Sequence, residues 1–403
     1  MHVKMKIMGF IKGMLIFGLI IMLGGCSGNS SSKFYKEGLK NIDSGNYEEA
    51  ASDFVKAIDI NPNRAEYYID YGMTLIMLNK NKEAIQNFNK AILDKENAIV
   101  HKNNKLAFRG KGIAYYKSFQ YKEAIEQFDR ALSIDVLSNL DMDILYYKGS
   151  AEEKAGFYED AIETYTLLIK LDSSNSKAYN YRGFAYGKLN QMDKGLSDYD
   201  KAISIDKRNY DHYLGKYFLL YDAGRMEEAY KVLEEAASIK IQTEEDKFNL
   251  AKVHFYMEEY NLAINEFSKA FENGFEESYY YLGNIYDKKE DYEEAVINYK
   301  KYIESKEIFM TAAVYNQIGA CLLKLGRYSE ALSYIQIGLE YQEKNLEQPL
   351  RRNEIIAYEE TGDFVTAYHL MTDYIEQYPE DKEAVKDYEF LKTRLQEVSK
   401  KRQ

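Results

Sequence analysis

The side chains that most often perform catalysis are sparse in this 403-residue chain. No two of its five histidines stand at the i, i+4 spacing that places metal ligands on one helical face. The two cysteines, Cys26 and Cys321, are too far apart for a zinc-type pair. The chain has neither a phosphate-binding GxxxxGK[ST] loop nor a GxSxG nucleophile motif. The sequence therefore predicts a protein that is not an enzyme and that has no catalytic residue, metal site or cofactor.

Adjacent glutamates recur, and paired carboxylates can act as a general acid and base. The pairs include Glu48-Glu49, Glu227-Glu228 and Glu293-Glu294. They stand at one register of a helical pattern, and adjacent residues on a helix do not face each other. Carboxylates at a helix start are also favoured by the positive end of the helix dipole. We therefore expect these pairs to be solvent-exposed helix starts.

The first 25 residues have the form of a secretion signal. A head that contains lysine but no acid precedes the apolar residues 14–23, and small residues follow. Because a span of the bilayer needs roughly 20 apolar residues, this segment is predicted to be cleaved. An uncleaved anchor and an ordinary signal with an incidental cysteine are the alternatives.

The end of this segment, Leu23-Gly24-Gly25-Cys26, resembles the lipobox of bacterial lipoproteins. The resemblance implies that residues 1–25 are removed and that the thiol of Cys26 carries a diacylglycerol group, whose acyl chains can be palmitate. Residues 26–33 would then be the lipidated cysteine and a short flexible tether on the extracytoplasmic face of a bacterial cell membrane. A disulfide to Cys321 is a further alternative, although Cys321 fits better as a small buried hydrophobe.

The composition predicts a folded, acidic protein. Hydrophobic residues make up 46% and charged residues 29% of the chain, and 65 acids against 53 bases give a net charge of −12. Such a surface gains little from neutralising phosphates, so we expect no general nucleic-acid binding.

The chain repeats itself from about residue 34 onward. Segments such as NYEEAASDF, QYKEAIEQF and DYEEAVINY align on a small residue that recurs at intervals of about 34 residues, which indicates ten repeats. Within the first repeat, Tyr47, Ala50, Phe54 and Ala57 fall on one face of a helix. Glycine recurs twelve residues before the aligned residue, where we expect two helices to approach closely. The aligned residues are Ala50, Ala84, Ala124, Ala161, Gly195, Ala229, Ala263, Ala295, Ala331 and Ala367.

This period, with a small residue at repeat position 8, alanine at 20 and 27 and an aromatic at 24, resembles the tetratricopeptide repeat family. The resemblance covers residues 34–379 and implies an all-α fold, a right-handed solenoid or superhelix of about ten helix-turn-helix repeats. Residues 380–403 are amphipathic and are predicted to be the C-terminal capping helix. The chain departs from the family in having Tyr or Phe for the usual Trp, and Ile355 at position 8 of the last repeat.

In that family a concave groove, lined by positions 2, 5, 6, 9, 12 and 13 of the first helices, holds a polypeptide. Aromatic residues gather at these positions in repeats four to eight, and tyrosine suits a binding surface because it offers rigid apolar area with a polar tip. Packing between repeats is the alternative role for these rings. The groove candidates are Tyr146, Tyr147, Tyr181, Phe184, Phe218, Tyr221, Phe248, Phe255, Tyr256, Tyr280 and Tyr281.

These observations predict a non-catalytic scaffold that binds a protein or peptide in its groove and is attached to the membrane through Cys26. The resemblance implies an accessory role in envelope assembly or secretion. The alternative is a protein that binds cell-wall glycan, because tyrosine rings also stack on sugars.

Overall fold

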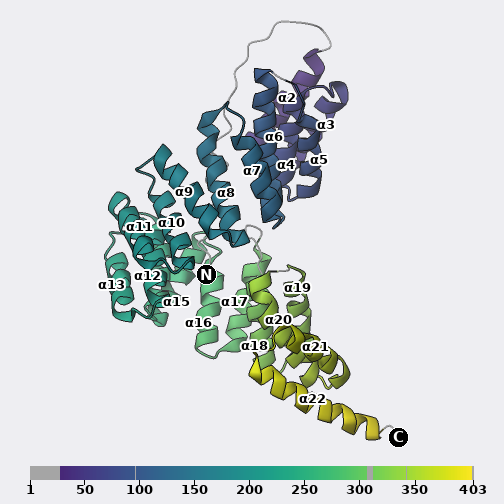
Figure 1. Cartoon of the computed structure of the whole chain (residues 1–403), viewed down its shortest axis with the longest axis vertical. Coiled ribbons are helices and arrows are strands. Elements are labelled where there is room, and N and C mark those ends of the chain that lie inside the picture. The colour runs from purple at the N-terminus through teal and green to yellow at the C-terminus, as the bar shows by residue number, and fades with distance from the viewer. Residues whose placement is uncertain (1–27, 96, 306–311, 342, 402–403) are drawn as a thin grey trace. The chain divides into compact units, whose positions relative to one another are not determined.

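Every regular element in the described part of the chain is a helix. The computed structural model describes residues 28–95, 97–305, 312–341 and 343–401, and within them it has 21 α-helices and one 3-10 helix, η1 (Ser138–Leu140) (Figure 1). The α-helices alternate as first and second members of ten hairpins, and one helix follows the last hairpin. The predicted all-α solenoid of ten repeats with a terminal helix is confirmed.

The chain divides into two compact units, Met1–Val232 and Leu233–Gln403, and each is described by itself. Five complete repeat pairs lie in the N-terminal unit: α2 (Gly28–Asp43) and α3 (Tyr47–Ile60), α4 (Ala65–Met77) and α5 (Asn81–Ala91), α6 (Ala98–Lys117) and α7 (Tyr121–Leu132), α8 (Asp141–Ala155) and α9 (Tyr158–Leu171), and α10 (Ser176–Lys188) and α11 (Met192–Ile205). The sixth pair is α12 (Tyr210–Asp222) and α13 (Met226–Ala237), and the boundary between the two units falls within α13.

The C-terminal unit continues the same alternation. Its helices are α14 (Glu244–Tyr256) and α15 (Tyr260–Glu272), α16 (Ser278–Lys288) and α17 (Tyr292–Glu304), α18 (Ala312–Lys324) and α19 (Tyr328–Glu340), α20 (Lys344–Glu360) and α21 (Phe364–Gln377), and the terminal α22 (Lys382–Lys401).

The two helices of a hairpin meet at the glycine of the first helix. A Cβ atom on Gly112 would lie 2.5 Å from a ring carbon of Phe128, and one on Gly149 would lie 2.5 Å from a ring carbon of Tyr165. Phe128 and Tyr165 occupy repeat position 24 and are almost fully buried. The missing Cβ therefore makes room for the aromatic ring of the partner helix, which confirms the close approach expected from the sequence.

Each hairpin turns through one residue in the left-handed region of backbone space, always at repeat position 15. Glycine holds this position in five repeats, but Phe119 (φ 60°), Glu258 (φ 63°) and Glu290 (φ 60°) adopt it as well. The turn is closed by a hydrogen bond from the amide of the next residue to the carbonyl five residues back, as from Asn46 to Asn41 at 2.8 Å. This Schellman-type closure satisfies the carbonyls at the end of the first helix. The ten residues are Gly45, Asn79, Phe119, Gly156, Asn190, Gly224, Glu258, Glu290, Gly326 and Gly362.

The additional residues before repeat three lengthen a helix. α6 has 20 residues, and Asn97 caps it by accepting a hydrogen bond from the Val100 amide at 2.9 Å. Asn104 then holds the preceding turn, since its side chain exchanges two hydrogen bonds with the backbone of Leu93. The insertion is part of the scaffold rather than a free loop.

The start of the array differs from the sequence-based expectation. Residues 28–33, which we assigned to a flexible tether, form the first turns of α2. Ser31 is 1% exposed, and its hydroxyl accepts a hydrogen bond from Tyr67 of α4 at 3.4 Å. This contact holds the beginning of α2 against the second repeat. Cys26 and the signal segment lie outside the described residues.

The end of the array is covered by α22. Ala384 and Leu391 are fully buried and pack with Ala367 and Met371 of α21, so α22 covers the apolar side of the last hairpin. Among the described helices, none combines the length and the apolar character that crossing a bilayer would require. Cys321 is 1% exposed in the core of the C-terminal unit, as expected of a small buried hydrophobe.

Candidate functional site

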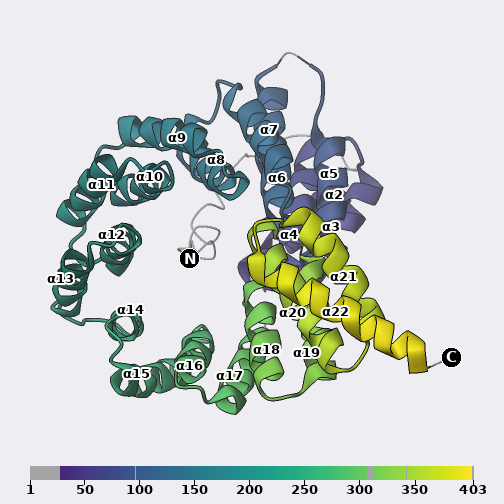
Figure 2. The same ribbon diagram turned by 60° about the horizontal axis from the view of Figure 1, so that its bottom comes forward.

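The side chains at positions 2, 5, 6, 9, 12 and 13 of the first helices form a surface that we call the first-helix face. In the N-terminal unit, α8, α10 and α12 lie on one side of α9 and α11 (Figure 2). The packed alanines and aromatic rings of each hairpin, such as Ala161 and Tyr165, lie between these two layers. On the opposite side of α8 and α10, side chains such as Tyr146 and Tyr181 are partly exposed.

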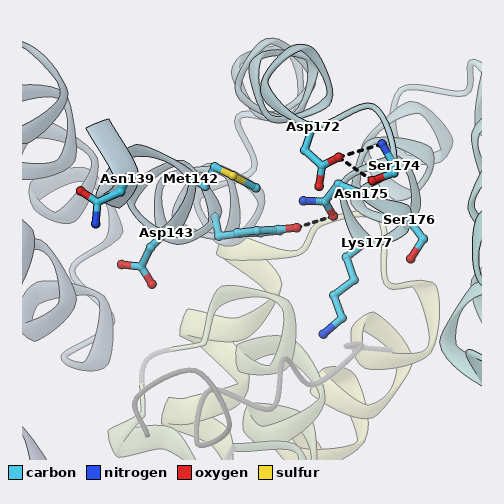
Figure 3. A pocket seen from close by; sticks show the side chains of 9 residues that line it. Asn139, Met142, Asp143, Asp172, Ser174, Asn175, Ser176 and Lys177 are labelled. Carbon is cyan, nitrogen blue, oxygen red and sulfur yellow. Dashed lines mark hydrogen bonds between the residues drawn. The ribbon is translucent and has the colours of Figure 1, made fainter. Parts of the chain in front are cut away.

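An open pocket of about 420 Å³ lies on this face, between the start of α8 and the turn that leads into α10. Figure 3 shows Met142 and Asp143 on one side of it and Asp172, Asn175 and Lys177 on the other. We call it the α8–α10 pocket. Its walls present amide, carboxylate and ammonium groups beside an aromatic ring, which suits recognition of a polar ligand.

Tyr146 is the aromatic wall of the pocket, and it joins two repeats. Its hydroxyl donates a hydrogen bond to Oδ1 of Asn175 at 2.5 Å, and the same oxygen caps α10 by accepting from the Ala178 amide at 3.2 Å. Burial raises the pKa of Tyr146 to about 12, so the phenol stays protonated. The ring is thus held in place before any ligand arrives.

Charges around the pocket are fixed by short contacts. Nε of Arg109, on α6, donates to Oδ2 of Asp143 at 2.5 Å, which compensates the charge of that buried carboxylate. Asp172 accepts hydrogen bonds from the backbone amide and hydroxyl of Ser174, and these bonds lower its pKa. Asp172 therefore contributes a stable negative charge at the rim.

A stripe along α8 continues the face beyond the pocket. Tyr146, Ser150 and Glu153 follow at i, i+4 and i+7, so they lie on one side of the helix. The Ser150 hydroxyl is 2.8 Å from the hydroxyl of Tyr116 on α6. Burial raises the pKa of Glu153 to about 8, and its Oε1 atom accepts no hydrogen bond from any residue that the structure describes.

The predicted groove residues of the N-terminal unit differ in depth. Tyr146, Tyr181, Phe184 and Phe218 are partly exposed, and Tyr221 is 48% exposed. The rings of Tyr146 and Tyr181 meet edge to face, with centroids 6.1 Å apart. The structure thus brings aromatic residues of repeats four and five together on the first-helix face.

Tyr147 is different, because it is 4% exposed and its ring stacks on Phe128 of the preceding repeat. Packing between repeats, the alternative role considered for these rings, is what the structure shows for it.

In the C-terminal unit, packing of the predicted residues predominates. Phe248, Phe255 and Tyr281 are each less than 9% exposed and belong to one core cluster. Tyr256 and Tyr280 are partly exposed at the edge of that cluster. Only these two of the five predicted aromatic residues in this unit present substantial surface.

Sequence reasoning missed the polar part of the site. Ser150 and Glu153 occupy groove positions 9 and 12 of repeat four, but the groove candidates predicted from the sequence were aromatic residues only. Asn175 precedes α10 and lies outside the groove register, although an asparagine directly before a helix is a recognisable capping signal. Its second role, as the acceptor for Tyr146, depends on the packing of adjacent repeats and has no sequence signal.

The acidic pairs behave as expected. Glu48 and Glu49 are exposed in the first turn of α3, and Glu293 and Glu294 are exposed in the first turn of α17. Across the residues that the structure describes, no group of three or more His, Cys, Asp or Glu side chains is placed to hold a metal ion.

Comparison with known families decides the assignment. Two family models, both described as tetratricopeptide repeat, match the chain, one over residues 35–98 and 109–176 and the other over residues 176–209, 276–309 and 312–345. Together they cover more than half of it. The chain is a tetratricopeptide repeat protein. Members of this family are generally non-catalytic and mediate protein–protein interactions, so that part of the sequence-based prediction is supported.

Individual relatives of this tetratricopeptide repeat protein match only in part. The chain is 32% identical to DnaJ homolog subfamily C member 7 of Mus musculus over 40% of its own length and 34% of that protein. It is 26% identical to the TPR repeat-containing protein YpiA of Bacillus subtilis over 59% of its length and 56% of that protein. The match thus spans about a third to a half of these relatives.

Solved structures of tetratricopeptide repeat proteins resemble the chain at low identity. A protein from Parabacteroides merdae is 16% identical, with a TM-score of 0.45, over 73% of this chain and 99% of that one. YrrB, described as a TPR protein with an unusual peptide-binding site, is 22% identical, with a TM-score of 0.38, over 46% of this chain and 91% of that one.

Proposed function

We propose that this protein is a membrane-anchored scaffold that holds a segment of a partner polypeptide against the first-helix face of repeats four and five, on the extracytoplasmic side of a bacterial membrane. The observation that carries the proposal is the combination of the α8–α10 pocket with the partly exposed rings of Tyr146 and Tyr181 beside it.

Three properties of this surface suit a polypeptide. Its rings are held by neighbouring repeats, so binding costs little conformational entropy. Tyr146 and Tyr181 offer apolar area next to hydroxyl groups, the type of side chain that dominates binding hot spots. The amide of Asn175 and the carboxylate of Asp172 stand beside those rings and suit the polar groups of a peptide backbone.

Support for the anchor comes from the sequence alone. Leu23-Gly24-Gly25-Cys26 ends an apolar segment at the place where a lipoprotein signal is cut, and Cys26 would carry the lipid. An attachment of this kind places the array beside a membrane, where accessory proteins of envelope assembly or secretion work.

The test of groove binding is affinity purification from the native membrane, with bound proteins identified by mass spectrometry. Tyr146→Ala and Tyr181→Ala each remove ring surface from the face and should weaken retention of the partner about tenfold or more. Tyr230→Ala is the matched control, because Tyr230 is 46% exposed on the second helix α13. Unchanged retention by both groove variants would overturn the proposal. Thermal melts must show that the variants remain folded.

The same variants separate a polypeptide ligand from a glycan. Sedimentation with purified cell wall that is lost in Tyr146→Ala and Tyr181→Ala, while no protein partner depends on these rings, would replace the scaffold by a glycan-binding protein. Neither Tyr147 nor Tyr281 is useful here, because both are buried and their loss would mainly reduce stability.

A further inference from the structure

Glu153 is the most unusual charged group on the first-helix face. It lies two turns beyond Tyr146 on the same side of α8, and its side chain is partly exposed. Its Oε1 atom, however, is buried and accepts no hydrogen bond within the described residues. A carboxylate that is partly removed from water without a full set of partners is costly, because transfer from water penalises its charge.

The groups around Glu153 are hydroxyls rather than cations. Burial raises the pKa of the tyrosines on the helices packed around it, and the negative charge of Glu153 adds to that rise. These tyrosines are Tyr116 on α6, Tyr158 and Tyr165 on α9, Tyr181 on α10 and Tyr199 on α11.

The charged neighbours of Glu153 do not neutralise it. Desolvation raises the pKa of Glu153 to about 8, although the interaction with the Tyr165 hydroxyl and the charge of Lys154 lower it; the charge of Glu152 adds to the rise. Glu152 has its own cation, since its Oε1 lies 3.4 Å from Nζ of Lys148. Phenol groups therefore surround Glu153, and the favourable effects of Tyr165 and Lys154 do not offset the desolvation of its carboxylate.

We propose that Glu153 binds a cationic side chain, a lysine ammonium or an arginine guanidinium, of the polypeptide that occupies the first-helix face. The inference rests on the proposed function and names the chemistry of the ligand. An ammonium group has three N–H donors and no acceptor, which complements one carboxylate surrounded by phenol oxygens. Neighbouring aromatic rings favour cations further. A metal ion fits less well, because no further carboxylate, histidine or cysteine completes a cluster in the described chain.

Binding of a cation should depend on pH in a defined direction. The free site is largely protonated at pH 7, and only its ionised form attracts a cation, so apparent affinity follows the ionised fraction. That fraction rises about tenfold between pH 6 and pH 7 and levels off above pH 8. A lysine ammonium stays charged throughout this range, so the change in apparent affinity arises from ionisation of the protein and not of the ligand.

The experiment uses three small probes with the full chain, observed through the ligand signals in NMR. They are the Nα-acetyl, N-methylamide derivatives of lysine, arginine and norleucine, and norleucine has the apolar stem of lysine without its charge. The lysine or arginine probe should bind, with an apparent affinity that increases about tenfold from pH 6 to pH 7, and the norleucine probe should not.

Two variants decide whether Glu153 is responsible. Glu153→Gln keeps the shape of the neutral side chain and should abolish both the binding and its pH dependence. Glu163→Gln removes the same charge from an exposed position on α9 and should leave both unchanged.

Three results would overturn the inference: equal binding of the norleucine probe, binding that persists in Glu153→Gln, or no cation binding at any pH up to 9. Because the probes are free amino-acid derivatives, their failure would leave polypeptide binding on this face untouched. The purification experiment, conversely, tests Tyr146 and Tyr181, and it can fail while the lysine or arginine probe still binds at Glu153.

Discussion

Arg182 binds Asp198 through two parallel hydrogen bonds, from Nε to Oδ2 at 2.7 Å and from Nη2 to Oδ1 at 2.8 Å. The pair joins α10 to α11 within repeat five, and Nη1 reaches back to the Thr166 hydroxyl of repeat four at 3.1 Å. Both charged side chains are largely buried, at 17% and 9% exposure. One guanidinium therefore connects the two helices of one repeat with the repeat before it.

Arg182→Ala should lower the free energy of unfolding by about 2 to 4 kcal/mol, because it leaves the Asp198 carboxylate buried without its partner. Urea unfolding followed by circular dichroism measures the change. Arg225→Ala is the control, since Arg225 pairs with Glu228 in solvent and its loss should leave the midpoint nearly unchanged. Equal effects of the two variants would show that the buried pair has no special role.

Gly112→Ala should destabilise the hairpin of repeat three by about 1 to 3 kcal/mol, although alanine is the better helix former. The new Cβ would lie 2.5 Å from the ring of Phe128, which is fully buried. A double-mutant cycle with Phe128→Leu tests the cause. If the contact is responsible, the cost of Gly112→Ala should shrink when the ring is absent, whereas an unchanged cost would place the strain elsewhere.

Glu290→Gly should raise the free energy of unfolding by about 0.5 to 1 kcal/mol. Glu290 has a left-handed backbone conformation that is unfavourable for a residue with a Cβ atom, and glycine adopts it without this strain. The relief of strain exceeds the additional chain entropy that glycine loses on folding. Thermal unfolding at fixed pH measures this. Glu290→Ala removes the same charge but keeps a Cβ, so it should give no gain. A gain in both variants would point to electrostatics instead of backbone strain.

His212 should make stability fall in mild acid. It is 1% exposed, its ring nitrogens have no hydrogen-bond partner among the described residues, and burial lowers its pKa to about 4 against the opposing effect of Asp211 and Asp206. Lys177 lowers it further. Because the unfolded chain takes up a proton near pH 6.5 and the folded chain only near pH 4, this contribution to stability is complete above pH 6.5. It is lost progressively as the pH falls to 4, by about 2 to 3 kcal/mol.

Comparison with His212→Leu isolates the contribution of His212 to the pH dependence of stability, since the buried carboxyl groups titrate in both proteins. The difference in unfolding free energy between the native protein and the variant should change by this amount between pH 7 and pH 4. A constant difference would mean that His212 is not protonated on unfolding in this range.

Cys26→Ser tests the proposed anchor. The variant should lose incorporation of radiolabelled palmitate and accumulate as an unprocessed precursor in whole cells. Ser27→Ala leaves the thiol in place and should be labelled and processed normally. A processed Cys26→Ser product retained in the membrane would contradict the lipid attachment.

The sequence predicted the repeat register because small residues recur at fixed positions of each repeat. Alanine and glycine recur at the close contacts between the helices of most hairpins, and the ten left-handed residues of the hairpin turns fall at a single repeat position. At Phe119, Glu258 and Glu290 the turn has no glycine to announce it, and the hairpin geometry imposes the conformation.

How deeply each side chain of the first-helix face is buried was harder to predict. Tyr146 and Tyr147 are neighbours in sequence and both lie at groove positions, yet one borders the pocket and the other stacks on Phe128. Helical periodicity gives the direction of a side chain from the axis but not how closely the next repeat packs on it. Glu153 was missed for the same reason, because tyrosines of its own repeat and of the repeats on either side pack around it.

The early start of α2 changes the mechanics of the proposed attachment. If Cys26 carries the lipid, Ser27 alone stands between it and the first helical residue, Gly28, so the chain from Cys26 to Gly28 can reach only about 7 Å. The contact between Ser31 and Tyr67 passes any motion of that helix to the second repeat. The attachment would then be short and rigid instead of a long flexible tether. The tilt of the first repeats against the bilayer would decide which partners the protein can reach.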